Sequence, residues 1–179
     1  MPRNIVVRGR PGSGKSTAIS LAIDYLRKNG VKITGMVTPE VRKGGIRMGF
    51  EALNLLTGEK VVLASVGQRG PSVGKYGVKL TLFNEFLLGL RLDEGDAIFI
   101  DEVGKMELMS DLFQSIVEKA LDMEKPAVFT APFYDLPFIK RMIARRDVEL
   151  IWINRGESEL VAKRITDRVL SWLKEGKGF

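Results

Sequence analysis

Residues 4–16 have the sequence Asn4-Ile-Val-Val-Arg-Gly-Arg-Pro-Gly-Ser-Gly-Lys-Ser16. The apolar, β-branched run at its start is short and ends in glycine, which predicts a buried strand over residues 4–8. Residues 15–29 repeat apolar side chains at helical spacing and are followed by a glycine stop signal, so a helix is expected directly after the glycine-rich turn. A strand, a glycine-rich turn and a helix in this order predict the first unit of an α/β fold.

The turn between this strand and helix, Gly9 to Ser16, matches the phosphate-loop pattern G-x-x-x-x-G-K-[ST] at every fixed position. Its glycines let successive N–H groups point inward as an anion nest, and the helix N-terminus adds the positive end of its dipole. We expect Lys15 to reach the β- and γ-phosphates, Ser16 to ligate Mg²⁺ and Thr17 to contact the α-phosphate. The candidate nucleotide-binding residues here are Gly9, Arg10, Pro11, Gly12, Ser13, Gly14, Lys15, Ser16 and Thr17.

A second candidate segment is the acidic pair Asp101-Glu102, which directly follows the apolar run of residues 97–100. Such a run predicts a buried parallel strand, and ligands bind at the carboxyl ends of these strands. Asp101 is therefore placed to hold Mg²⁺ together with Ser16, directly or through water. Glu102 is the best candidate for a general base that deprotonates water, because the chain contains no histidine. Acidic residues also end strands without a function, so this assignment depends on the phosphate loop.

The stretch that follows, Val103-Gly104-Lys105-Met106-Glu107, leaves two interpretations open. Lys105 can contact the γ-phosphate and offset charge in the transition state. On this interpretation the candidate catalytic residues are Lys15, Glu102 and Lys105, and Gly104 joins the nucleotide-binding set with Asp101, Glu102 and Lys105. Alternatively, Lys105 is a solvated lysine at a loop tip, and Glu107 is a first-turn helix residue favoured by the helix dipole.

The rest of the chain alternates between strand and helix patterns, with one interruption. We expect strands at residues 31–38, 97–100, 127–130 and 148–153, and helices at 82–92, 107–122, 136–146 and 157–174. Strands at 46–55, 61–65 and 76–80 have no helices between them, which predicts an antiparallel β-insertion around residues 45–81. The expected architecture is a three-layer α/β sandwich with a mostly parallel central sheet.

Two further segments have weaker signals. Asn154 and Arg155 follow the last expected strand at the edge of the sheet where the phosphate loop lies, so both are candidate nucleotide-binding residues. Arg155 can stack its guanidinium plane on a base, or the segment is a turn that caps the next helix. The glycine-rich residues 67–77 are either a mobile flap over the triphosphate or a plain hairpin connection.

The composition limits what the chain can do. Its 179 residues are expected to form one domain, 1–179, with no membrane-spanning segment and a cytoplasmic location. It has no cysteine and no histidine, which excludes thiolate metal sites and histidine catalysis. The expected cofactor is Mg²⁺, held by Ser16 and Asp101. The net charge of +6 makes nucleic acid a possible partner but not a required one. The oligomeric state and the base preference stay open.

The chain resembles the small P-loop nucleoside-triphosphatases of thermophiles, whose vertebrate member is called cancer-related nucleoside-triphosphatase. The resemblance depends on four segments in the family's order, which are residues 9–17, 70–78, 100–108 and 154–155. The stretch Asp-Glu-Val-Gly-Lys-Met-Glu, at 101–107, is the most diagnostic. The resemblance implies a Rossmann-like P-loop NTPase domain with antiparallel additions. It also implies a magnesium-dependent hydrolase that converts ATP, GTP and other nucleoside triphosphates to the diphosphate and phosphate.

Two other classes of function remain as alternatives. A nucleotide or small-molecule kinase would use the same loop but needs a second substrate pocket. A regulatory nucleotide-binding module or a nucleic-acid-associated ATPase is compatible with the basic surface. Phosphate release from ATP and Mg²⁺ alone separates hydrolysis from the kinase, and a steep salt dependence of RNA or DNA binding would favour the module.

Overall fold

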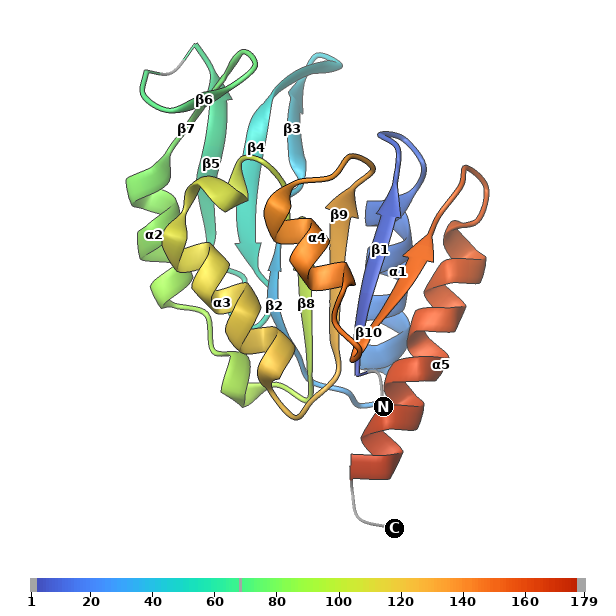
Figure 1. Ribbon diagram of the computed structural model, residues 1–179. Helices are drawn as coiled ribbons and strands as arrows, with labels where there is room; N and C mark the ends of the chain where they lie inside the picture. Colours follow the sequence, from blue (N-terminus) through green and yellow to red (C-terminus); the bar gives the residue numbers. More distant parts are fainter. Residues whose placement is uncertain (1–2, 68, 177–179) are drawn as a thin grey trace.

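The parallel half of the sheet is built from the strands that alternate with helices along the chain. The computed structural model describes residues 3–67 and 69–176. In this half lie, side by side, β10 (Val148–Trp152), β1 (Asn4–Gly9), β9 (Ala127–Pro132), β8 (Ala97–Asp101) and β2 (Ile33–Val37). Each strand runs parallel to its neighbours. Their carboxyl ends therefore share one edge of the sheet, which is at the top in Figure 1.

The antiparallel half continues from β2. It contains, in spatial order, β4 (Ile46–Asn54), β5 (Lys60–Val66), β7 (Tyr76–Val78) and β6 (Ser72–Val73), while β3 (Glu40–Lys43) pairs with β4. All of these pairings are antiparallel. Figure 1 shows β3, β4 and β5 rising beyond the carboxyl ends of the parallel strands. This half of the sheet therefore flanks the edge where the phosphate loop lies.

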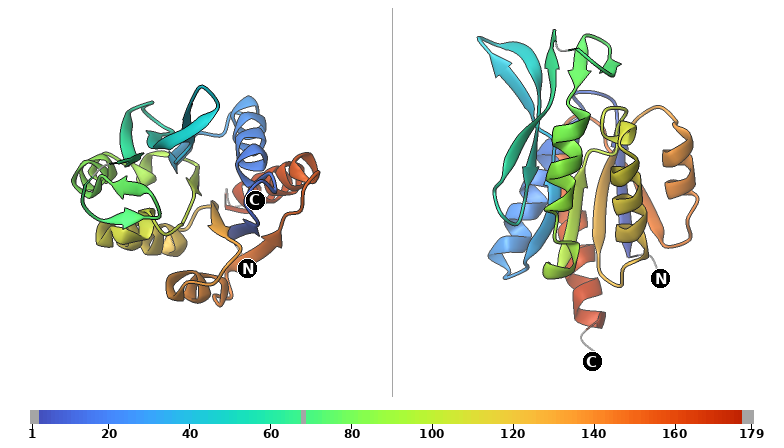
Figure 2. Two further views of the ribbon diagram at one scale, coloured as in Figure 1. Left: turned by 90° about the horizontal axis from the view of Figure 1, so that it is seen from above. Right: turned by 90° about the vertical axis from the view of Figure 1, so that its left-hand side faces the viewer.

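Helices cover both faces of the sheet. The helices α1 (Lys15–Lys28) and α5 (Ser158–Gly176) pack against each other on one face. The other face is covered by α2 (Leu80–Leu88), α3 (Asp111–Asp122) and α4 (Pro137–Ile143), as the view from above in Figure 2 shows. The predicted three-layer α/β fold with a mixed, largely parallel core is thus confirmed.

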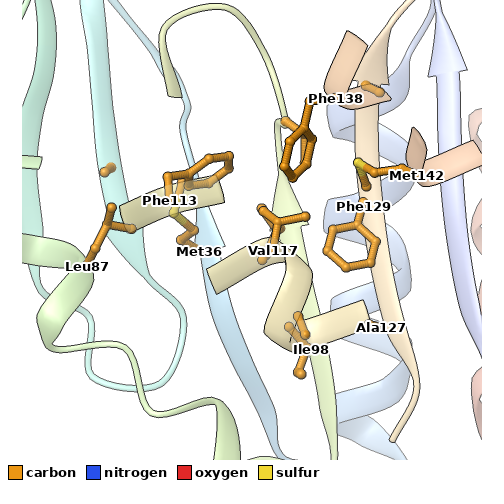
Figure 3. Close-up of a cluster of buried hydrophobic side chains, with 14 of the residues drawn as sticks. Met36, Leu87, Ile98, Phe113, Val117, Ala127, Phe129, Phe138 and Met142 are labelled. Atoms are coloured by element: carbon orange, nitrogen blue, oxygen red, sulfur yellow. The ribbon is translucent and has the colours of Figure 1, made fainter. Parts of the chain in front are cut away.

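A buried apolar core lies on each face of the sheet. Under α2, α3 and α4, Phe113 and Val117 from α3 meet Ile98 and Phe129 from the sheet, and all four are fully buried (Figure 3). The second core, under α1 and α5, contains Ile5, Val7, Ile19, Leu26, Phe99, Ile165 and Val169. Because Ile98 and Phe99 are adjacent on β8 but belong to different cores, this strand is buried on both faces, as its unbroken apolar sequence predicted.

The structure differs from the expectation at several element ends. The helix expected at 107–122 is split, because Ser110 accepts a hydrogen bond from the Phe113 N–H (3.0 Å) and caps α3, which begins at Asp111. Residues before it form a separate 3-10 turn, Glu107–Met109. The helix expected at 82–92 lies at Leu80–Leu88, and the strand expected at 76–80 ends at Val78. The helix expected at 136–146 spans only Pro137–Ile143.

The antiparallel insertion begins at β3, earlier than the expected residue 45. The sequence did not predict this strand. Its residues Arg42 and Lys43 are charged, and a strand exposed in this way has no apolar alternation to reveal it. The signal that was available is Gly44-Gly45, which joins β3 to β4 with positive φ at both positions (59° and 79°). Residues 72–78 form the β6–β7 hairpin, and Gln68 lies outside the described residues.

No helix in the described part of the chain combines the length and hydrophobicity that a transmembrane segment requires.

Candidate active site

The phosphate loop joins the end of β1 to the start of α1. Gly12 and Gly14 have φ angles of 76° and 98°, in the left-handed region that favours glycine. Gly14 is the N-cap of α1, so the first N–H groups of this helix are presented at the loop. Ser158 Oγ, at the start of α5, donates to the Gly14 carbonyl oxygen (3.1 Å) and anchors a second helix here. The loop therefore offers an anion-binding helix N-terminus at the carboxyl edge of the sheet.

The phosphate loop borders an open cavity. Residues 10–17 all line this cavity, which has a volume of about 530 Å³. Lys15 Nζ donates to the Gly9 carbonyl oxygen (2.6 Å), so the ammonium group lies across the loop. Arg10 places its guanidinium carbon 5.0 Å from the ring centroid of Phe133, which also lines the cavity. The positive charge of the loop is thus concentrated where a polyphosphate would enter.

Asp101, at the end of β8, lies next to the phosphate loop. Its side chain is only 7% exposed, and Oδ1 accepts a hydrogen bond from the Thr130 hydroxyl on β9 (2.5 Å). Ser16 lines the same cavity as Asp101. Burial raises the pKa of Asp101, while the hydrogen bond from Thr130, the nearby Ser16 hydroxyl and the charge of Lys15 lower it. The two predicted metal ligands, Ser16 and Asp101, are therefore brought together.

Glu102 points toward the same region. Burial raises its pKa, the charge of Lys15 lowers it and the charge of Asp101 raises it. A methyl group added at Gly104 would lie 3.0 Å from Glu102 Oε2 and 3.1 Å from Glu107 Oε1. The absence of a side chain at Gly104 therefore leaves room for two carboxyl groups to approach the same point.

Lys105 and Gly104 lie in a second cavity, of about 490 Å³, which Ser16, Asp101 and Glu102 also line. Lys105 is exposed, and its Nζ lies 4.8 Å from the ring centroid of Tyr134. The pKa of Tyr134 is raised by burial and by the negative charges of Glu102 and Glu107. The cation, the ring and the carboxyl groups thus border one space next to the phosphate loop.

Asn154 and Arg155 lie apart from the acidic residues. They line a third cavity, of about 410 Å³, which residues 9–13, Phe133 and Trp152 also line. The Asn154 N–H donates to Glu157 Oε1 (2.7 Å), which closes the turn before α5. Asn154 is therefore part of a capping turn, and Arg155 borders a space on the outer side of the phosphate loop.

Sequence analysis missed three residues that contact this site. The Thr38 hydroxyl, just after β2, donates to Glu107 Oε2 (2.8 Å), and the Thr38 N–H donates to the Asp101 carbonyl oxygen (2.6 Å). Glu107 is 6% exposed, and its pKa is raised to about 8 by burial and by the charge of Glu102. Thr130 was detectable, because it is a polar residue at the end of an apolar strand. The burial of Glu107 had no local signal.

Comparison with known proteins places the chain among P-loop enzymes of similar length. A family model described as NTPase matches residues 4–166. The nucleoside-triphosphatase THEP1 of Korarchaeum cryptofilum is 40% identical, with 94% of this chain and 88% of the relative covered. The corresponding protein of Methanopyrus kandleri is 35% identical, with 98% and 99% covered.

Solved structures with the same fold extend this similarity. The crystal structure of THEP1 from the hyperthermophile Aquifex aeolicus has a TM-score of 0.79 at 27% identity and covers 93% of this chain and 98% of that one. The solution structure of a human cancer-related nucleoside triphosphatase has a TM-score of 0.81 at 32% identity, with 94% and 98% covered.

Proposed function

Since the chain belongs to the NTPase family, we propose that it hydrolyses nucleoside triphosphates, including ATP and GTP, to the diphosphate and inorganic phosphate. The family model and the relatives confirm the resemblance that the motifs indicated. The observation that carries the proposal is the position of four residues at one edge of the sheet: Lys15, Ser16, Asp101 and Glu102. A phosphate-binding loop, a pair of oxygen ligands and a carboxylate beside them are the parts that triphosphate hydrolysis requires.

The donor set fits a magnesium ion. Ser16 and Asp101 offer hard oxygen ligands, and the hydrogen bond that Asp101 accepts from Thr130 fixes the orientation of its carboxyl group. Ser16 and Asp101 would hold the ion, which when bound supplies charge neutralisation at the β- and γ-phosphates. The buried Asp101 would then be ionised, because a neighbouring cation lowers the pKa of a carboxyl group.

The chain's own residues bind the triphosphate, accept the proton of the attacking water and compensate negative charge. The N–H groups of the phosphate loop and the Lys15 ammonium bind the triphosphate and leave the γ-phosphorus facing Glu102. The oxygen of a water molecule bonds to this phosphorus while the bond to the β–γ bridging oxygen breaks, and the electron pair stays with the diphosphate. Glu102 accepts a proton from the water and returns it to solvent. Lys105 offsets negative charge on the transferred group.

The nucleobase of the triphosphate would lie in the cavity beside the phosphate loop that Arg155 borders. Arg155 borders the cavity there together with Phe133 and Trp152, so flat cationic and aromatic groups surround the space. Stacking on such groups tolerates any base, because every base has a π-face. We therefore expect ATP, GTP, CTP and UTP to be accepted with similar efficiency.

Phosphate release from each of the four triphosphates, with Mg²⁺ and no other substrate, tests the proposal. Release without a second substrate is expected, and its absence would favour a kinase. Lys15→Ala should lose both binding and turnover, because it removes the cation of the loop. Glu102→Ala should keep Mg·ATP binding but lower turnover by about 10²-fold or more. Normal turnover in Glu102→Ala would show that Glu102 is not the base. A reaction with added RNA checks whether nucleic acid changes the rate.

A further inference from the structure

The β3–β4 hairpin brings additional charge to the phosphate site. Its two strands are joined by the tight Gly44-Gly45 turn, and it rises beside the edge of the sheet that holds the phosphate loop (Figure 1). Two arginines, Arg42 and Arg47, lie opposite each other in the hairpin register. Because the hairpin leads directly from the end of β2, it is fixed to the same edge as Asp101.

Arg47 and Arg42 differ in their relation to the site. Arg47 lines the same cavity of about 530 Å³ as residues 10–17 and Glu102. Arg42 is not among the described residues that line this cavity. Both side chains are about half exposed, at 45% and 50% respectively. The pair therefore offers two arginines of equal charge and similar exposure, of which only one borders the phosphate loop.

Glu40 holds both arginines. Its Oε1 accepts from Arg42 Nε at 2.6 Å, and its Oε2 pairs with Arg47 Nε at 2.7 Å. The hydrogen bond from Arg42, with the charges of both arginines, lowers the pKa of Glu40, so this carboxylate stays ionised at neutral pH. Two cations on one anion leave the cluster with a net positive charge. Arg42 and Arg47 thus share one carboxylate, and Arg47 contacts it through Nε, while a guanidinium group has two further terminal nitrogens that can donate to a second acceptor.

We propose that Arg47 is a catalytic residue that contacts the γ-phosphate of the bound triphosphate and stabilises the charge of the transition state. The proposal rests on the hydrolysis proposed above. As the bond from the γ-phosphorus to the bridging oxygen breaks, negative charge grows on that oxygen, and charge on the γ-oxygens must still be compensated. A planar guanidinium group matches two such oxygens at once. Glu40 lines the same cavity, and its carboxylate holds the Arg47 guanidinium group, so it is a positioning residue for Arg47.

Arg47 also differs from Lys105. Lys105 borders the neighbouring cavity and is not among the described residues that line the cavity over the phosphate loop. Arg47 belongs to a hairpin inserted into the α/β core, whereas Lys105 follows the acidic pair directly in the chain. The two cations therefore reach the site from different elements, and substitution of one leaves the other in place.

The matched pair Arg47→Ala and Arg42→Ala tests this role. Arg47→Ala should lower kcat for ATP by about 10²-fold, the loss that follows removal of one transition-state donor, with KM changed by less than about threefold. Arg42→Ala should keep kcat within about threefold of the wild type. Arg47→Lys, which keeps the charge but loses the planar fork, should fall between the two. The melting temperature of each variant shows that the fold is intact.

A binding measurement separates transition-state contact from ground-state binding. Arg47→Ala should weaken binding of ADP with aluminium fluoride, a mimic of the transferring phosphoryl group, by about 10²-fold. Binding of a non-hydrolysable ATP analogue should change by less than about fivefold. Equal losses of kcat in Arg47→Ala and Arg42→Ala, or equal losses of affinity for both ligands, would overturn the assignment. No phosphate release from the wild type would instead refute the proposed hydrolysis itself.

Discussion

Replacing Glu107 with glutamine removes a buried carboxyl group and should change how the stability of the protein depends on pH. Glu107 is 6% exposed, and its carboxyl group accepts a hydrogen bond from the Thr38 hydroxyl. Burial and the neighbouring charge of Glu102 raise its pKa from the usual 4.5 to about 8. The folded protein therefore keeps this proton between pH 4.5 and 8, while the unfolded chain loses it.

The sign and the size of the effect follow from this difference. Because the folded state binds one more proton in this window, the free energy of unfolding falls as pH rises, by up to about 1.4 kcal/mol per pH unit. Below pH 4.5 both states are protonated and the contribution is constant. With a folded pKa of about 8, the wild type should lose roughly 2.5 kcal/mol from this group between pH 5 and pH 7. Glu107→Gln cannot ionise and should not show this loss.

Urea unfolding without nucleotide or Mg²⁺, followed by tryptophan fluorescence at pH 5, 6, 7 and 8, measures the effect. The quantity to compare is the difference in the free energy of unfolding between Glu107→Gln and the wild type. This difference should move in favour of the variant by about 2.5 kcal/mol from pH 5 to pH 7. Glu118→Gln, on an exposed position of α3, is the matched control. A difference that stays constant from pH 5 to pH 8 would show that Glu107 is not a buried neutral acid.

Three further substitutions test other parts of the structure. Thr130→Val keeps the shape of the side chain but removes the hydrogen bond to Asp101. It should raise the Mg²⁺ concentration needed for half-maximal phosphate release about tenfold, and an unchanged Mg²⁺ requirement would contradict the role of Thr130. Gly35 has a φ of 114°, and Gly35→Ala introduces a methyl group that would overlap the Phe99 carbonyl. The substitution should cost about 3 kcal/mol of stability or prevent folding, as measured by the yield of soluble protein and the melting temperature. Phe113→Ala empties a fully buried position of the core, and should lower the free energy of unfolding by about 4 kcal/mol in urea; a loss below about 1 kcal/mol would mean that the site collapses around the smaller side chain.

The phosphate loop and the alternating core could be predicted because both have local signals. Gly9 to Ser16 combines a fixed spacing of glycines with a strand before it and a helix after it. Residues 97–100 are continuously apolar, which predicted a strand buried on both faces and placed Asp101 at the end of it. In these cases the property that matters is written into neighbouring residues of the chain.

The order of the strands had no such signal. Along the chain β8 precedes β9, but in the sheet β9 lies between β8 and β1. This order depends on how the crossover helices pack, and local sequence patterns do not record it. One consequence is that Thr130 on β9 reaches Asp101 on the neighbouring β8.

The acidic residues of the site also differ in how far the sequence could predict them. Asp101 and Glu102 were found because they stand directly after an apolar strand. Glu107 was interpreted as a possible first-turn residue of a helix, since acidic residues are common there. In the structure Ser110 caps α3 instead, and this leaves Glu107 in a 3-10 turn that faces the interior. The burial that raises the pKa of Glu107 then comes from packing against segments distant in sequence, including Thr38, which is 69 residues away. Because Glu107 keeps its proton at pH 7, it adds no negative charge beside Glu102, the proposed base.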